Sequence, residues 1–189
     1  MKLAIGNIVF TKVKSEYDEE WYDWLSSELS IPFLNNSKLQ IRLDFNDQEL
    51  DEFKSELEKT LNNTLALDKD DREYLKEHLF AYYRDFVLDV GEECLEDMPA
   101  QENEDDIFEF VHISSLSISR SSITEEFFCQ FTGGCDWEIE HGISISFKDG
   151  KNLAKVGGCG HINNSDAYAD KSMDKYIYYG NIVKTYAAE

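Results

Sequence analysis

The chain has 189 residues, of which 42% are hydrophobic and 13% aromatic, and this composition supplies a core and argues against disorder. Its 39 acidic residues outnumber 18 basic ones and give a formal net charge of −21, which disfavours nucleic acid and anionic lipid as partners because both bind through Lys and Arg. We find no apolar run of about 18 residues that could span a bilayer and no signal-peptide pattern at the N-terminus, so we expect a cytoplasmic protein.

The first 45 residues predict two strands with a short helix between them. Apolar side chains across residues 1–12 indicate a strand that breaks near Gly6. Ser15 offers an N-cap, and the spacing of large apolar residues across 21–25 predicts a short helix after it. Residues 37–45 alternate between apolar and polar side chains, which predicts a half-buried strand.

A helical, acidic segment is predicted over about residues 46–98. Apolar residues three or four apart indicate one helix over 47–61 and a second that starts near Asp68. Residues 46–106 hold 6 basic and 21 acidic side chains, a net charge of −15, and we expect this excess on the outer helix faces and in an exposed loop over 92–106. The apolar stripe of the second helix comprises Tyr74, Leu75, His78, Leu79, Tyr82, Tyr83, Phe86 and Val90.

The remainder, about residues 107–189, is predicted to be rich in β-strands. Strands are expected over 107–112, 126–131, 142–147 and 153–156, with a tight turn at Lys148-Asp149-Gly150. The last stretch is rich in Tyr and is expected to close the sheet or cover one of its edges. The whole chain therefore predicts a single α+β domain over 1–189, with a mostly antiparallel sheet and two main helices packed on one side.

Potential metal ligands gather in the C-terminal half. They are Cys129, Cys135, His141, Cys159 and His161. Zinc sites usually show paired C-x2-C spacings, which these residues lack, so we favour free thiols and expect no cofactor. A zinc site formed by these residues stays open as an alternative.

Catalytic motifs are not apparent. His141, flanked by Glu138 and Glu140, has the chemistry of a general base, but the sequence contains neither a G-x-S-x-G element nor an H-E-x-x-H element. Asp136, Glu138, Glu140 and Asp149 do not have the spacing of a calcium-binding EF-hand loop. We therefore expect no catalytic residues, and we retain a hydrolytic or zinc enzyme built on His141, Glu140 and the cysteines as the alternative.

The segment from Trp137 to Gly150 resembles a W-x-x-E-H-G-x-x-x-x-F-x-D-G element found in a group of small bacterial domains of unknown function. The matching residues are Trp137, Glu140, His141, Gly142, Phe147, Asp149 and Gly150. The resemblance extends over roughly residues 1–157 and implies a non-enzymatic accessory protein. Some similar domains serve as immunity proteins in contact-dependent or polymorphic toxin systems.

This element also has a purely structural interpretation. Trp137 can fill the core where a strand turns, and Gly142 can permit the turn of the backbone. Glu140 or Asp136 can accept hydrogen bonds from local amides, and Asp149-Gly150 can form a hairpin.

Together these observations predict an immunity protein that binds a bacterial toxin domain with a basic surface, such as a nuclease, through its acidic helices. The expected contact residues are Glu49, Asp51, Glu52, Glu56, Asp70, Asp71, Glu73 and Glu77, with Tyr83 or Trp24 as aromatic anchors. An acidic adaptor without a toxin partner is a further alternative.

Overall fold

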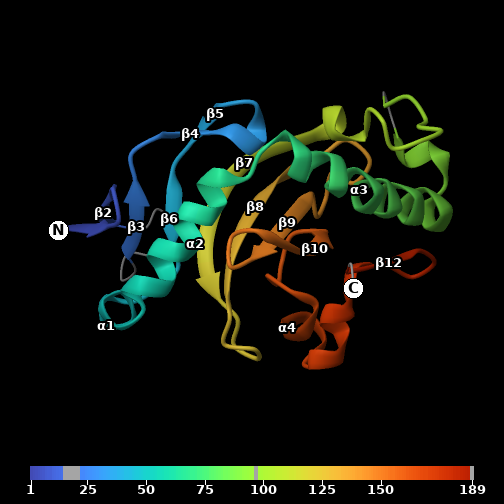
Figure 1. Ribbon diagram of the computed structural model, residues 1–189. Helices are drawn as coiled ribbons and strands as arrows, with labels where there is room; N and C mark the ends of the chain where they lie inside the picture. Colours follow the sequence, from blue (N-terminus) through green and yellow to red (C-terminus); the bar gives the residue numbers. More distant parts are fainter. Residues whose placement is uncertain (15–21, 96–97, 188–189) are drawn as a thin grey trace.

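A computed structural model describes residues 1–14, 22–95 and 98–187. Within them, an eight-stranded sheet has the strand order β1-β2-β3-β6-β7-β8-β9-β10 (Figure 1). Neighbouring strands are antiparallel except β6 and β7, which are parallel. The strands are β1 (Lys2–Ile5), β2 (Ile8–Lys14), β3 (Tyr22–Ser26), β6 (Ile41–Leu43), β7 (Val111–Arg120), β8 (Phe127–Cys135), β9 (Ile143–Lys148) and β10 (Asn152–Gly157).

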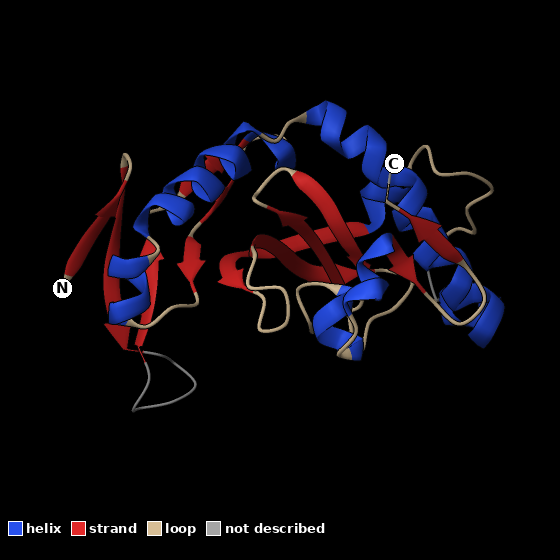
Figure 2. Cartoon of the chain, turned by 60° about the horizontal axis from the view of Figure 1, so that its bottom comes forward, coloured by secondary structure: helices blue, strands red, loops and turns tan. Residues whose placement is uncertain are grey.

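The main helices, α2 (Lys54–Ala66) and α3 (Lys69–Val90), lie on one face of this sheet (Figures 1 and 2). Phe131, Ile145 and Phe147 belong to the buried core, and the central strands β8 and β9 are buried along continuous runs rather than only at alternate residues. The predicted α+β fold with a mostly antiparallel sheet is therefore confirmed. None of the helices in the described part of the chain has the length and apolar character needed to cross a membrane.

Side-chain caps set the starts of the helices. Asn46 caps α1 (Asp47–Glu52) in a capping box with Glu49, and Asp68 caps α3 in a second box with Asp71, so the predicted start near Asp68 is confirmed. The first predicted helix is instead two helices, α1 and α2, which meet at Phe53, and α2 continues to Ala66.

The prediction of a helix over residues 15–25 is wrong for the residues that the structure describes. Residues 22–26 form β3, which pairs with β2 on one side and with β6 on the other, whereas residues 15–21 lie outside the described part of the chain. Large side chains spaced three apart indicated a helix, but two neighbouring strands satisfy the backbone of β3 instead.

The single strand predicted over 37–45 is divided at Gln40. β5 (Ser37–Leu39) pairs with β4 (Leu29–Ile31) in a small hairpin, whereas β6 belongs to the main sheet. The backbone N–H of Ile41 donates to the Ser26 hydroxyl over 2.8 Å, which holds the chain where it passes from one sheet to the other.

The segment over 92–106 is only partly the exposed loop that we predicted. It begins with a 3-10 turn, η2 (Glu92–Leu95), and the side chains of Leu95 and Met98 are buried. A second turn, η3 (Ile107–Phe110), precedes β7, so the β-rich half begins at Val111 rather than at Ile107.

The C-terminal residues form α4 (Asn164–Tyr168), a 3-10 turn η4 (Lys171–Lys175) and a hairpin of β11 (Tyr176–Tyr179) and β12 (Lys184–Tyr186). β11 lies against β10, the last strand of the sheet, and both hairpin strands contact α3. The prediction that this stretch covers a sheet edge is therefore confirmed.

Two buried polar side chains of α3 hold this hairpin. The Asp85 carboxylate accepts hydrogen bonds from the Tyr178 hydroxyl and from the backbone N–H groups of Asn181, Ile182 and Val183. About two helical turns earlier in α3, His78 Nδ1 shares a 2.7 Å hydrogen bond with the Thr185 hydroxyl. Both α3 side chains are almost fully buried.

Acid is expected to weaken the fold through His78. Burial lowers the pKa of His78 from 6.5 to about 4, so the unfolded chain binds this proton more readily than the folded chain. The associated stability is present above pH 6.5 and is lost as the pH falls toward 4. Between about pH 7 and pH 5 the unfolded chain takes up this proton, while the folded chain stays largely unprotonated at His78. One pKa unit corresponds to about 1.4 kcal/mol, so the free energy of unfolding should fall by about 2 kcal/mol over this range.

Urea unfolding at several pH values measures this loss in the wild-type protein and in His78→Gln. The variant should lack about 2 kcal/mol of the pH dependence, whereas His161→Gln, a change at an exposed histidine, should retain it. Equal pH dependence in all three proteins would contradict the assignment to His78.

Candidate functional site

The predicted contact acids lie on the helices, and most of them are exposed. Six carboxylates point outward and are here called the acidic ridge: Asp51, Glu52, Glu56, Asp70, Glu73 and Glu77. The other two candidates are half-buried and stabilise helix starts, since Glu49 accepts from the Asn46 N–H over 2.9 Å and Asp71 accepts from the Asp68 N–H over 2.9 Å. The helices therefore present a surface of negative charge.

The acidic ridge falls into two groups rather than one patch. One group lies on α1 and the start of α2, and the other lies on the first turns of α3 (Figure 1). At about 1.5 Å per residue, the length of α2 separates them by roughly 20 Å. The helices carry few basic side chains, and two of them are already paired within the chain. Lys59 forms an ion pair with Asp149, and Lys76 forms one with Glu73.

Neither predicted aromatic anchor is exposed. Trp24 is 2% exposed, and its indole N–H donates to Asp47. Tyr83 is 4% exposed, packs edge-on against Trp137, and accepts a hydrogen bond from the Gln101 backbone N–H through its hydroxyl. Both rings belong to the core, so they cannot serve as contact residues on the surface.

The Trp137–Gly142 part of the recognised element forms a turn organised by Glu138. Trp137 is buried, and Gly142 has the positive φ of 60° that this turn needs. We expected Glu140 or Asp136 to accept the local amide hydrogen bonds, but the buried Glu138 does so, from the N–H groups of residues 140 and 141. Its carboxylate also accepts from the Tyr82 hydroxyl over 3.2 Å, so it ties the turn to α3.

His141 and Glu140 are both exposed in this turn. The imidazole Nδ1 of His141 lies 3.1 Å from Glu138 Oε2, so its carboxylate partner is Glu138 and not Glu140. This arrangement orients the ring at the surface. Cys159 contacts His141 through the backbone, since its N–H donates to the His141 carbonyl, while the Cys159 thiol points to the carbonyl of Ile143.

The Asp149-Gly150 part of the element forms the predicted turn between β9 and β10. Gly150 has a φ of 72°, and a Cβ built there would lie 2.3 Å from the Thr60 carbonyl oxygen of α2. Asn63 of α2 also donates to the Asp149 carbonyl over 2.8 Å. The turn therefore docks against α2, and its residues have a structural role.

The candidate metal ligands do not converge. Cys129 and Cys135 are buried thiols, and burial raises the pKa of each to about 12, which disfavours the thiolate that zinc requires. Cys159 and His161 are exposed. In the described ranges, no group of three or more His, Cys, Asp or Glu side chains is placed to hold a metal ion.

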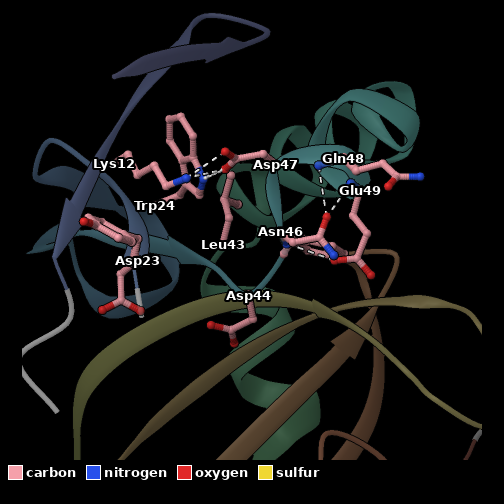
Figure 3. Close-up of a pocket in the computed structure, with 11 residues that line it drawn as sticks. Lys12, Asp23, Trp24, Leu43, Asp44, Asn46, Asp47, Gln48 and Glu49 are labelled. Carbon is pink, nitrogen blue, oxygen red and sulfur yellow. Dashed lines mark hydrogen bonds and ion pairs between the residues drawn. The ribbon is translucent and has the colours of Figure 1, made fainter. Parts of the chain in front are cut away.

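A concavity lies where β3, β6 and the start of α1 meet (Figure 3). We call it the acidic pocket; it has a volume of about 810 Å³. Its lining residues are Lys12, Tyr22, Asp23, Trp24, Leu43, Asp44, Phe45, Asn46, Asp47, Gln48 and Glu49. The lining thus carries four carboxylates and one lysine, and the pocket opens beside the α1 group of the acidic ridge.

Lys12 and Asp47 form an ion pair in the acidic pocket. Lys12 Nζ lies 2.7 and 2.8 Å from the two Asp47 oxygens (Figure 3). The ammonium also lies over the rings of Tyr22 and Trp24, at 5.3 and 5.8 Å from their centroids. The hydrogen bond from Lys12 holds the pKa of Asp47 below its usual value. The pocket therefore already accommodates one cation of the chain itself.

Glu49 and Trp24, which we predicted as contact residues, line the acidic pocket, whereas Asp23, Asp44 and Glu138 were not among the predicted site residues. Asp23 lies within the segment 21–25 that was interpreted as helical, which hid its position on a strand. Glu138 follows Trp137 directly and carries no spacing signal of its own. Asp85 had a usable signal, because it lies three residues after Tyr82 and thus places an acid within an apolar helix stripe.

Comparison with known proteins finds a family match. A family model described as a domain of unknown function, DUF6985, matches residues 9–162. No curated protein and no solved structure matches the chain. The family description mentions neither the Trp137–Gly150 element nor a toxin system.

Proposed function

Because the chain belongs to the DUF6985 family, whose description names no activity, we propose a function from the surface of the molecule. We propose that it is an immunity protein that binds and neutralises a bacterial toxin domain with a basic, nuclease-like surface. The observation that supports this proposal most directly is the outward position of the acidic ridge in a segment with a net charge of −15. Such a field attracts a cationic partner and accelerates the encounter.

Two modes of neutralisation are compatible with this surface. The carboxylates can occupy a cleft lined by Lys and Arg, where they take the place of nucleic-acid phosphates. Alternatively, the chain can grip another basic surface and distort the toxin. Because α2 separates the two groups of the ridge, a partner that spans both must present basic side chains over roughly 20 Å.

The direct test uses the purified product of the gene immediately upstream and measures its affinity for this chain. The ridge variant Asp51→Lys/Glu52→Lys/Glu56→Lys should weaken binding about 10- to 100-fold at low salt, because each reversal places a cation against a basic partner. Added salt should reduce the difference, since it screens exposed charges.

The matched control is Glu28→Lys/Glu109→Lys/Glu140→Lys, which changes the net charge equally at three exposed acids away from the ridge. It should retain most of the affinity. If no complex forms at low salt, or if the control loses as much affinity as the ridge variant, the proposed docking surface is wrong. An acidic adaptor would instead bind a basic protein that is not a toxin.

A further inference from the structure

The acidic pocket exists because two neighbouring strands separate. β3 and β6 pair only at Trp24 with Leu43 and at Leu25 with Arg42. One step further along an antiparallel ladder, Asp23 would lie directly opposite Asp44. Like charges at facing positions destabilise a strand pair, and the ladder ends at this point. Asp23 and Asp44 both line the pocket (Figure 3).

The charges of Asp23 and Asp44 act on each other. Asp44 forms an ion pair with Arg42, whose Nε donates over 2.7 Å, and its side chain is 37% exposed. Partial desolvation still raises the pKa of Asp44 above its ordinary value, and the charge of Asp23 adds to this. The Asp23 side chain has no hydrogen bond or ion pair with any other residue that the structure describes. A cation placed between the two would relieve this repulsion.

An aromatic ring lies beside Asp23 in the chain. Tyr22 precedes Asp23 on β3, lines the pocket, and is 52% exposed. The Lys12 ammonium shows how the pocket takes a cation, since it combines the Asp47 carboxylate with the faces of the Tyr22 and Trp24 rings. Asp23 and Asp44 add two further carboxylates to the same lining.

We infer that the acidic pocket receives one arginine side chain of the basic partner, with its guanidinium between Asp23 and Asp44 and beside the Tyr22 ring. This inference rests on the proposed function. A planar guanidinium presents several N–H donors and stacks on aromatic rings, so it satisfies two carboxylates and a ring together better than an ammonium does. The pocket would act as the central anchor, and the acidic ridge would steer the partner toward it.

The first experiment tests the pocket without the partner. N-acetyl-arginine amide is titrated into the isotope-labelled full chain and followed by backbone amide NMR shifts, with the neutral isostere N-acetyl-citrulline amide as the comparison. The arginine compound should shift residues 22–24 and 43–46, and citrulline should not. Equal shifts with both compounds, or arginine shifts that spare these residues, would overturn the inference.

The second experiment uses Asp23→Asn/Asp44→Asn, which removes both charges and keeps the side-chain shape. The arginine shifts should disappear, and the affinity for the upstream gene product should fall about 10- to 30-fold, as expected for an anchor contact. The matched control, Glu28→Gln/Glu109→Gln, removes two exposed charges elsewhere and should change the affinity less than about threefold. Thermal melts establish that both variants fold.

The outcomes separate the two proposals. If the partner binds and the pocket variant binds as tightly as its control, the arginine pocket is wrong and the proposed function stands. If arginine occupies the pocket but the upstream product does not bind, the toxin partner is wrong and the pocket stands. Shifts produced by CaCl₂ but not by the arginine compound would identify the pocket as a divalent-cation site and overturn the inference.

Discussion

Asp85→Ala is expected to lower the free energy of unfolding by about 3–5 kcal/mol, because it leaves several buried donors without an acceptor. The lost partners are the Tyr178 hydroxyl and the N–H groups of Asn181, Ile182 and Val183, all of which converge on one carboxylate that is 5% exposed. Without that acceptor, the β11–β12 hairpin should detach from α3 first. Urea unfolding gives the free energy, and amide hydrogen exchange over 176–186 reports the local opening.

Asp89→Ala is the matched control, since Asp89 lies one turn further along α3 and is exposed. It should change the stability by less than about 0.5 kcal/mol. A similar small effect from Asp85→Ala would show that the carboxylate does not hold the hairpin. The result also concerns the part of the chain outside the family match. Asp85 lies within residues 9–162, which match the family model, but it binds residues that follow this region.

Gly150→Ala should destabilise the fold by about 2–4 kcal/mol, because two costs add. The residue has a φ of 72°, and a Cβ would lie 2.3 Å from the Thr60 carbonyl oxygen and 2.6 Å from the Thr64 hydroxyl oxygen. Both contacts belong to α2, so relief of the clash requires the β9–β10 turn and this helix to move apart. The measurement is the urea midpoint at constant m-value.

Gly134→Ala supplies the comparison in the same sheet. A Cβ at Gly134 would meet no heavy atom within 4 Å, so the variant should unfold near the wild-type urea concentration. If Gly150→Ala matched it, the turn would not be docked as described. The expected difference would support a structural role for the Asp149-Gly150 part of the recognised element.

Local patterns predicted those elements whose stability depends on neighbours in sequence. The β9–β10 hairpin followed from alternation around Lys148-Asp149-Gly150, and the start of α3 followed from Asp68. Patterns failed where distant segments decide the backbone pairing. Residues 22–26 are a strand because β2 and β6 flank them, and the strand predicted over 37–45 is divided between two sheets.

The candidate site shows the same division. The sequence by itself determined the sign of the surface and the segment that carries it, because charge is a property of composition and helical periodicity places polar residues outward. Only the tertiary structure decided that Trp24 and Tyr83 are buried, that Glu138 organises the turn before β9, and that Asp23 and Asp44 line one pocket. The physical reason is that burial and the facing of charges arise from contacts between segments far apart in the chain, which no local spacing encodes.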